Sequence, residues 1–365
     1  MLTRALPLVL LSALVVAACG GNDKPSTSGA SGSSGGSAKA SKVAVLLPDT
    51  KSSVRYEEFD RPLLTKAFQA AGVPVQVSNA QGDTQAQRTQ ADQAMTNGAK
   101  VLLLDALDSG TGAAIEADAN SQGVKVIDYD RLVLNGTADY YVSFDNTEVG
   151  RLQGQGLVSC LGSKSGGVPI AMLNGSPTDN NATLFKQGAH QILDPKFADG
   201  TYKKVAEQAV PDWDNQQALT IFEQMLQQTK NKIGGVLAAN DGLANAAISA
   251  LKARRLPQIP ITGQDATLQG IQNIITGDQC MTVYKPVQQE VAAAAKLATA
   301  LAKGQTPTGV TASTDNGSKK VPSILLKPIS VTKANIKTYF GRPDFPTQAQ
   351  VCAGNVASAC TSAGL

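Results

Sequence analysis

The sequence predicts an α/β fold with two doubly wound parallel-sheet lobes joined by a three-segment hinge. Short apolar runs alternate with helical patterns along most of the chain, at a spacing that favours right-handed β-α-β crossovers. The same alternation starts again near the middle of the chain. With 365 residues, the chain is too long for one ordinary domain and fits two. We therefore expect two similar lobes with a cleft between them, where a ligand would bind.

The N-terminal residues have the pattern of a targeting segment followed by a linker. Arg4 precedes the apolar run PLVLLSALVV, which is too short to span a membrane as a stable helix. Val16-Ala17-Ala18-Cys19 resembles a bacterial lipobox, in which the signal is removed before the cysteine and the cysteine is acylated. We expect residues 1–18 to be a signal peptide and Cys19 to carry a lipid anchor, although a plain secretory signal with a chance cysteine is the alternative. Residues 19–41 are mostly Gly, Ser and Ala, which predicts a flexible tether.

We expect the first lobe to comprise residues 42–144 and 284–318. It starts with the strand KVAVLLPD and a helix over about residues 57–71. The pattern recurs at VPVQVSNA, KVLLLDAL and KVIDYDR, before the strand YYVSFDN. The helical run QEVAAAAKLATALAKG would return to this lobe later in the chain.

We expect the second lobe to comprise residues 145–283 and 319–340. A helix over 147–160 leads into VPIAMLNG, VAEQAV and GGVLAA, each followed by a helical pattern, and then into IPITG and CMTVY. The run SILLKPISVT is expected to return to this lobe, which gives three crossings, the last near residue 320. Multiple crossings suit a hinge. Residues 341–365 form an Ala- and Ser-rich tail.

Polar groups come directly after three strands of the predicted second lobe. GGVLAA runs into Asn240 and Asp241, IPITG into Gln264 and Asp265, and CMTVY into Lys285. Ligands of open parallel sheets bind beyond the carboxyl ends of the strands, so these groups point to a binding site. Two amides, two carboxylates and an ammonium, without a metal-ligand cluster, suit a neutral polyhydroxylated molecule. The alternative is that the two aspartates only cap the helices after them.

Cysteine usage suggests two disulfides in an exported protein. Four cysteines follow Cys19, and an even number in an oxidising compartment suggests bridges. Cys352 and Cys360 close a short loop in the tail, so we expect them to pair. By elimination, Cys160 and Cys280 would then form the second disulfide.

Composition and motifs argue against nucleic-acid binding and catalysis. The net charge is only +3 and is spread along the chain without a basic block. Asp128 with Asp130, and Asp241 with Asp265, could be read as paired carboxylates for glycoside hydrolysis, but the chain has no nucleophile elbow, phosphate loop or His-rich metal spacing. The one histidine, His190, lies in a helical stretch and is expected to be a surface or packed residue. We predict a binding protein with no enzymatic activity, no cofactor and no metal.

Several runs of the sequence support a family resemblance. LLPDTKSSVRYEEFDRP, DYDR, YVSFDN, NGSPTDNNATLF, ANDGLANAAISAL, GQDA and MTVYKP resemble the bacterial D-xylose-binding solute-binding proteins of the periplasmic-binding class I superfamily. The resemblance covers about residues 42–330. It implies a monomeric lipoprotein on the outer face of the cell membrane. Such a protein binds D-xylose or a related monosaccharide between its lobes, closes about the hinge and delivers the sugar to an ABC transporter permease.

The resemblance also implies a set of sugar contacts, with donors and acceptors suited to hydroxyl groups. The positions that match the family are Arg55, Asp130, Arg131, Asp179, Asn181, Trp213, Asn240, Asp265 and Lys285, and Tyr56 and Lys186 are added to the predicted site at two positions that depart from the family. Trp213 is the only tryptophan of the chain, and its flat face would cover the C–H face of a pyranose, although it could instead seal the edge of the lobe. Lys186 stands where family members have arginine, and Tyr56 where many have tryptophan.

The sequence argues against one alternative to a xylose-binding component of an importer and leaves two others open. A sugar-responsive repressor of the same fold would carry a helix-turn-helix ahead of the lobes, where this chain has a signal and a tether. A lipoprotein that reports a sugar to a receptor would have the same sequence features, so this reading stays open. Binding of another pentose or of a hexose also stays open.

Overall fold

The structure, a computed structural model, describes residues 41–365. The predicted signal peptide at 1–18, the predicted lipidation site Cys19 and the predicted tether up to residue 40 lie outside the described residues. Among the described helices, none is long and apolar enough to cross a membrane.

The first lobe is built on a seven-stranded sheet with the strand order β10-β11-β5-β4-β3-β1-β2. Neighbouring strands are parallel except β10 and β11, which pair antiparallel. The strands are β1 (Lys42–Leu47), β2 (Val75–Asn79), β3 (Ala99–Leu104), β4 (Lys125–Tyr129), β5 (Tyr140–Phe144), β10 (Ala312–Asp315) and β11 (Lys320–Leu326).

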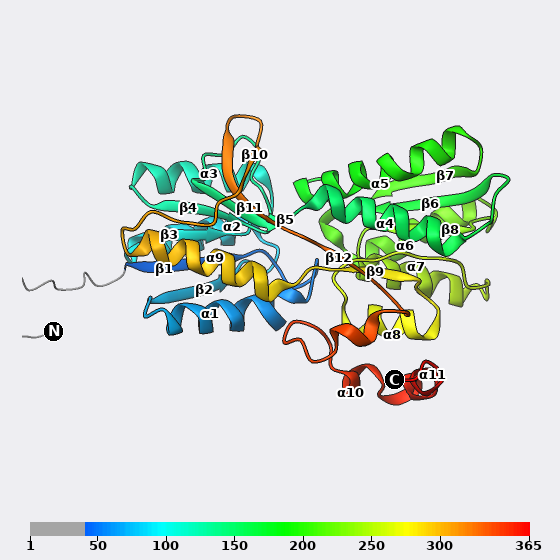
Figure 1. Ribbon diagram of the computed structural model, residues 1–365. Coiled ribbons are helices and arrows are strands. Elements are labelled where there is room, and N and C mark those ends of the chain that lie inside the picture. The colour runs from blue at the N-terminus through cyan, green and yellow to red at the C-terminus, as the bar shows by residue number, and fades with distance from the viewer. Residues whose placement is uncertain (1–40) are drawn as a thin grey trace, which may run out of the picture. The chain divides into compact units, whose positions relative to one another are not determined.

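Helices cover both faces of this sheet (Figure 1). Successive residues of β1 point to opposite faces, so Val43 and Val45 pack with α1 and α9, while Ala44 and Leu46 pack with α2 and α3. This burial on both sides explains why the strand is a continuous apolar run. The helices are α1 (Arg61–Ala70), preceded by the single turn η1 (Tyr56–Asp60), α2 (Thr84–Thr96), α3 (Ser109–Ser121) and α9 (Val287–Ala302).

The second lobe repeats the plan with fewer strands. β6 (Val168–Asn174), β7 (Tyr202–Ala209) and β8 (Gly235–Ala238) form a parallel sheet in the order β7-β6-β8. β9 (Met281–Tyr284) and β12 (Ile329–Thr332) pair antiparallel beside it. Its helices are α4 (Asn146–Leu161), α5 (Asn180–Ala198), α6 (Asn215–Gln228), α7 (Asp241–Ala253) and α8 (Leu268–Thr276), with the single turn η2 (Pro211–Trp213) before α6. The predicted α/β fold with two parallel-sheet lobes is confirmed.

Most of the long helices begin at a residue whose side chain caps the first turn. Such a side chain accepts a hydrogen bond from a backbone N–H that has no partner within the helix. Because the caps come shortly after strand ends, they also fix where the chain turns at the edge of each sheet. The capping residues are Asp83 for α2, Asp108 for α3, Asp145 for α4, Asp179 for α5, Asp214 for α6, Asn240 for α7 and Thr267 for α8.

The last crossing between the lobes lies later in the chain than predicted. Residues 319–340 were assigned to the second lobe, but β11 pairs in register with β5 of the first sheet, from Ser323 opposite Tyr141 to Leu326 opposite Phe144. Pro328 explains the correction, because it has no backbone N–H and interrupts the ladder. The run SILLKPISVT therefore contains the end of β11 in the first lobe and the whole of β12 in the second, and the chain crosses between Leu326 and Ile329.

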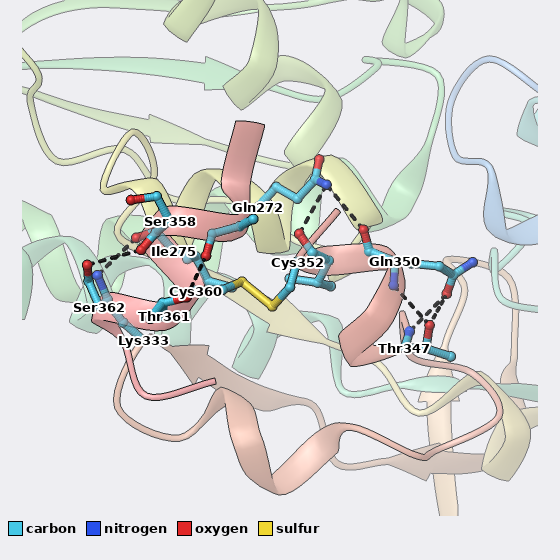
Figure 2. Close-up of a disulfide and its surroundings, with 12 residues drawn as sticks. Gln272, Ile275, Lys333, Thr347, Gln350, Cys352, Ser358, Cys360, Thr361 and Ser362 are labelled. Carbon is cyan, nitrogen blue, oxygen red and sulfur yellow. Dashed lines mark hydrogen bonds between the residues drawn. A yellow bond between two sulfur atoms is a disulfide. The ribbon is translucent and has the colours of Figure 1, made fainter. Parts of the chain in front are cut away.

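The C-terminal tail packs against α8 and β9. It contains the short elements η3 (Ile336–Tyr339), α10 (Gln348–Val351), η4 (Gly354–Val356) and α11 (Ala357–Ser362). Figure 2 shows the Cys352–Cys360 disulfide that closes this segment, with Gln272 of α8 donating to tail carbonyl groups. A second disulfide joins Cys160 at the end of α4 to Cys280 before β9. These are the two pairs expected from the sequence.

We predict that the Cys160–Cys280 disulfide stabilises the fold more than the Cys352–Cys360 disulfide. The paired cysteines are 120 residues apart in the first case and 8 in the second. The chain-entropy model gives about 5 kcal/mol for the longer loop and about 2.5 kcal/mol for the shorter one. Urea unfolding of the C160S/C280S and C352S/C360S variants measures the two losses in free energy of unfolding. Equal losses, or a larger loss for the tail disulfide, would contradict this prediction.

Candidate functional site

A cavity between the two lobes gathers polar side chains from the carboxyl ends of strands in both. Its empty space, counted to the open mouth, is about 300 Å³. The lining residues are Ser52, Ser53, Arg55, Tyr56, Asp130, Arg131, Asp179, Asn181, Phe185, Trp213, Asn240, Gln264, Asp265 and Lys285. All the sugar contacts predicted from the sequence, apart from Lys186, line this cavity.

Lys186 lies outside the cavity, so its predicted role as a sugar contact is wrong. Its side chain is 48% exposed, and its Nζ atom is 3.0 Å from Oε1 of Glu207 on the outer surface of the second lobe. Successive residues of an α-helix point about 100° apart, because one turn takes about 3.6 residues. In α5 this rotation turns Phe185 into the cavity and Lys186 away from it.

Asp130 is the carboxylate on which groups from several elements converge. Its Oδ2 accepts a hydrogen bond of 3.0 Å from the Tyr56 hydroxyl, and its Oδ1 accepts one of 3.3 Å from Nη1 of Arg55. The Lys285 ammonium lies 3.9 Å from the same Oδ1. Burial alone would raise the pKa of Asp130, but the Arg55, Lys285 and Arg131 cations lower it to about 2. Asp130 is therefore an ionised acceptor at neutral pH.

Arg55 is held by two buried carboxylates behind the cavity wall. Its Nε and Nη2 atoms each donate to Asp60 at 2.8 Å, and Nη2 also donates to Oε2 of Glu290 at 2.6 Å. Burial raises the pKa of Glu290 to about 8, against the lowering effect of Arg55. The hydroxyl of Tyr129 donates to Asp60 from the other side. Arg55 thus reaches the cavity from a fixed position.

Arg131 connects the two lobes through Asp179. In the first lobe, its Nη2 atom donates to Oγ of Ser52 at 3.0 Å and to the Tyr56 hydroxyl at 3.2 Å. Its Nε atom lies 3.5 Å from Oδ2 of Asp179 at the start of α5, and 3.4 Å from the buried Asp105. Burial raises the pKa of Asp179, against the lowering effect of Arg131.

Further polar contacts join the lobes around the cavity. Asn240, the cap of α7, donates from Nδ2 to the carbonyl oxygen of Ser52 at 3.1 Å. Asn181 donates from Nδ2 to the carbonyl oxygen of Asp130 at 3.0 Å. The Ser53 hydroxyl donates to Oδ2 of Asp265 at 3.3 Å. The cavity is consequently formed by both lobes together, and its polar walls are largely buried.

Aromatic side chains form one wall of the cavity. Trp213 and Phe185 pack edge to face with ring centroids 6.3 Å apart, and the indole Nε1 donates to Oδ2 of Asp179 at 3.1 Å. Gly175 lies against the indole so closely that a Cβ atom there would overlap it. Trp213 therefore lines the cavity.

The structure also shows that Asp241 and Asp265 do not cap the helices that follow them. The caps of α7 and α8 are Asn240 and Thr267, so neither aspartate is an N-cap. Asp241 is buried away from the cavity and accepts hydrogen bonds of 2.8 Å from the backbone of Thr267 and from Gln279 and Thr282. Asp265 lines the cavity, with its Oδ1 3.5 Å from Nζ of Lys285.

Four lining residues were not among the predicted contacts. Phe185 lies one helical turn after Asn181 and so shares its face of α5, which is the signal that could have found it. Gln264 follows the run IPITG together with Asp265, but only Asp265 was predicted as a sugar contact. Ser52 and Ser53 lie beside Arg55 in the loop after β1, and no pattern in the sequence separates them from other loop serines.

The charges of the lining side chains balance. Three cations, Arg55, Arg131 and Lys285, face three carboxylates, those of Asp130, Asp179 and Asp265. Within residues 41–365, no group of three or more His, Cys, Asp or Glu side chains is placed to hold a metal ion. A balanced set of donors and acceptors beside an aromatic wall suits a neutral molecule that has hydroxyl groups and an apolar face.

Several known proteins are similar to this chain over most of its length. Residues 43–306 match the family model described as a periplasmic binding protein domain. The D-xylose-binding periplasmic protein of Escherichia coli (strain K12) is 38% identical over 301 residues, which cover 82% of this chain and 89% of that protein. The multiple sugar-binding periplasmic receptor ChvE of Rhizobium radiobacter is 35% identical over 312 residues, which cover 80% of this chain and 87% of that protein.

A solved structure is similar in fold and sequence. The carbohydrate transporter solute binding protein from Chloroflexus aurantiacus, in complex with D-glucose, has a TM-score of 0.76 and 32% sequence identity to this chain. The match covers 83% of this chain and 98% of that chain.

We predict an acid-dependent loss of stability that depends on Asp130. Its pKa of about 2 in the folded protein lies below its ordinary value of 3.8. Ionised Asp130 therefore stabilises the fold by about 2 kcal/mol above about pH 4, and this contribution is lost as the pH falls toward 2. The difference in free energy of unfolding between the wild type and Asp130→Asn should shrink by that amount over this range, in urea titrations at several pH values. A difference that stays constant with pH would show that Asp130 is not held ionised by its neighbours.

Proposed function

The chain belongs to the periplasmic binding protein domain family, and on that basis we propose that it is the extracytoplasmic sugar-binding component of an ABC importer, with D-xylose as its ligand. The observation that carries the proposal is the charge-balanced cavity between the lobes, with its polar lining and aromatic wall. Similarity to a D-xylose-binding periplasmic protein over most of both chains supports the choice of sugar.

The chemistry of the lining suits a sugar ring. Asp130 and Asp265 can accept from hydroxyl groups, Lys285 can donate, and Asn240 can do both. Charge-assisted hydrogen bonds of this kind are roughly twice as strong as neutral ones. Trp213 offers an apolar face to the C–H groups of the ring, which buries apolar area while the hydroxyl groups stay with the polar residues.

A cavity shaped to fit a pentose would exclude a hexose by volume. D-xylose lacks the hydroxymethyl group of glucose, so it needs less space. An epimer that turns one hydroxyl away would leave a buried donor or acceptor unpaired, at a cost of about 1–3 kcal/mol. Broader monosaccharide specificity is the second candidate, because the similar protein from Chloroflexus aurantiacus holds D-glucose and ChvE is named as a multiple sugar-binding receptor.

Binding would favour closure of the lobes, because only contacts made to both lobes at once stabilise the closed form. Arg131 and Asp130 supply the first-lobe side of such contacts, and Asn240 and Asp265 supply the second. We propose that a single chain, which holds a complete site, presents the closed lobes to a permease and delivers the sugar unchanged. A receptor in the membrane is the alternative partner.

Two lysines provide a matched test of the site. We predict that Lys285→Met weakens D-xylose binding about ten- to a hundredfold, the effect of losing a hydrogen bond to a charged group. Lys186→Met should leave the affinity within about twofold of the wild type, because Lys186 points to the outer surface. Isothermal titration calorimetry of a protein that starts at Ser41 measures both. Equal effects of the two substitutions would refute the placement of the site.

The same titration with other sugars tests the ligand. Ribose, arabinose, glucose and galactose should bind more weakly than D-xylose. Tighter binding of another sugar would keep the site and reassign the specificity, whereas no heat with any of them would contradict the sugar-binding function.

We also propose that Cys19 carries a lipid anchor after removal of residues 1–18, so that the protein stays at the outer face of the cell membrane. The lipobox-like Val16-Ala17-Ala18-Cys19 supports this proposal. Cys19→Ala should move the protein from the membrane fraction to the soluble extracytoplasmic fraction, as measured by fractionation and immunoblotting. Membrane retention of the Cys19→Ala protein would argue for another means of attachment.

A further inference from the structure

Asp344 of the C-terminal tail bridges the two ends of the crossing segment that carries Lys285. Its Oδ1 accepts a hydrogen bond of 2.6 Å from the hydroxyl of Tyr284, the last residue of β9. Its Oδ2 accepts one of 2.8 Å from the backbone N–H of Gln288, in the first turn of α9. Asp344 is only 5% exposed. One buried carboxylate therefore ties the end of a second-lobe strand to the start of a first-lobe helix, with Lys285 between them.

Asp344 also supplies an acceptor that the start of α9 lacks. The N-cap position is Pro286, which gives no side-chain cap. The first backbone N–H groups of a helix need acceptors, and a carboxylate is favoured there by the helix dipole. The helices α2, α3 and α7 take this acceptor from their own N-cap residue, whereas α9 takes it from the tail.

The tail is built to hold Asp344 in place. Tyr339 and Phe345 pack edge to face on the Tyr284 ring, with centroids 5.7 and 5.2 Å away. Beyond them, the Cys352–Cys360 segment packs on α8, where Gln272 donates to the Val351 carbonyl at 3.2 Å (Figure 2). Asp344 is thus fixed to the second lobe by apolar packing on both sides of it in sequence.

The position of the Lys285 ammonium depends on the backbone of this crossing segment. Its ammonium lies between two carboxylates of the cavity, 3.5 Å from Asp265 in the second lobe and 3.9 Å from Asp130 in the first. Its side chain is 6% exposed. A shift of the backbone between Tyr284 and Gln288 would move the ammonium away from both carboxylates.

We propose that Asp344 is a positioning residue for sugar binding: it fixes the crossing segment so that Lys285 stands between the two lobes in the geometry that binds the sugar. The proposal rests on the sugar-binding function proposed above. The C-terminal tail is then a part of the binding machinery that never touches the ligand.

The test begins with Asp344→Ala in the protein that starts at Ser41. D-xylose affinity, measured by calorimetry, should fall about tenfold, the low end of the ten- to hundredfold loss expected when Lys285 itself is removed. Asp83→Ala is the matched control, because its side chain accepts from the backbone N–H of Ala86 in α2 and bonds no group of the crossing segment, so the affinity should be unchanged. Unchanged affinity in Asp344→Ala, or an equal loss in Asp83→Ala, would overturn the proposal.

A double-mutant cycle separates positioning of Lys285 from general loosening of the structure. In the Lys285→Met background, Asp344→Ala should cause no further loss of affinity, measured by ligand-observed NMR at high sugar concentration. The same tenfold loss in both backgrounds would show that Asp344 acts without Lys285. If Asp344→Ala does not fold, Tyr284→Phe removes one of the two contacts, and a loss of about threefold is expected. Unchanged affinity of Tyr284→Phe would then count against the proposal.

Sugar binding by the wild-type protein separates a failure of this proposal from a failure of the proposed function. A wild-type protein that binds no sugar contradicts the proposed function. Sugar binding by the wild type that is unaffected at Asp344 contradicts only the role of the tail.

Discussion

Charged side chains can be buried in a cavity only where each one meets a partner of opposite charge or a hydrogen-bonding group. Asp130 meets this constraint through Arg55, Tyr56 and Lys285, which reach it from the loop after β1 and from a crossing segment. Arg131 meets it through Asp105 in its own lobe and Asp179 on the opposite lobe. Because Lys285 and Asp179 add partners from the crossing segment and the second lobe, the charges are balanced most fully when the lobes meet, and the same groups then form a site for a neutral molecule.

The backbone at this site is held in conformations that most residues avoid. Asp130, Trp213 and Asp265 have positive φ angles of 59°, 56° and 93°. Such conformations cost on the order of 1–3 kcal/mol each for residues other than glycine. Backbone hydrogen bonds to neighbouring strands hold two of them, from Asp130 to Val142 at 2.9 Å and from Asp265 to Val283 at 2.8 Å, while the Trp213 N–H donates to the Val210 carbonyl at 3.3 Å. Strain at three lining residues is consistent with a site that needs fixed side-chain directions.

The sequence predicted the site residues at the ends of strands better than those on the surfaces of helices. Asn240, Asp265 and Lys285 could be found because the carboxyl ends of parallel strands lie along one edge of a sheet. Lys186 was placed wrongly, because the resemblance aligns positions but does not say which side of α5 faces the cavity. Phe185 was missed because an apolar residue in a helix is expected in the core, although it shares the face of α5 that carries Asn181. The boundary near residue 320 was wrong because Pro328 splits one apolar run between two sheets.

Asp344 could not have been found from sequence, because its importance comes from two partners that lie about 60 residues earlier in the chain and no periodic pattern connects them. One ligand held by both lobes at once should draw them together, and small-angle X-ray scattering with and without D-xylose tests this most directly. We predict a smaller radius of gyration when the sugar is bound. Identical scattering from the free protein and from protein saturated with a sugar that calorimetry shows to bind would contradict the account.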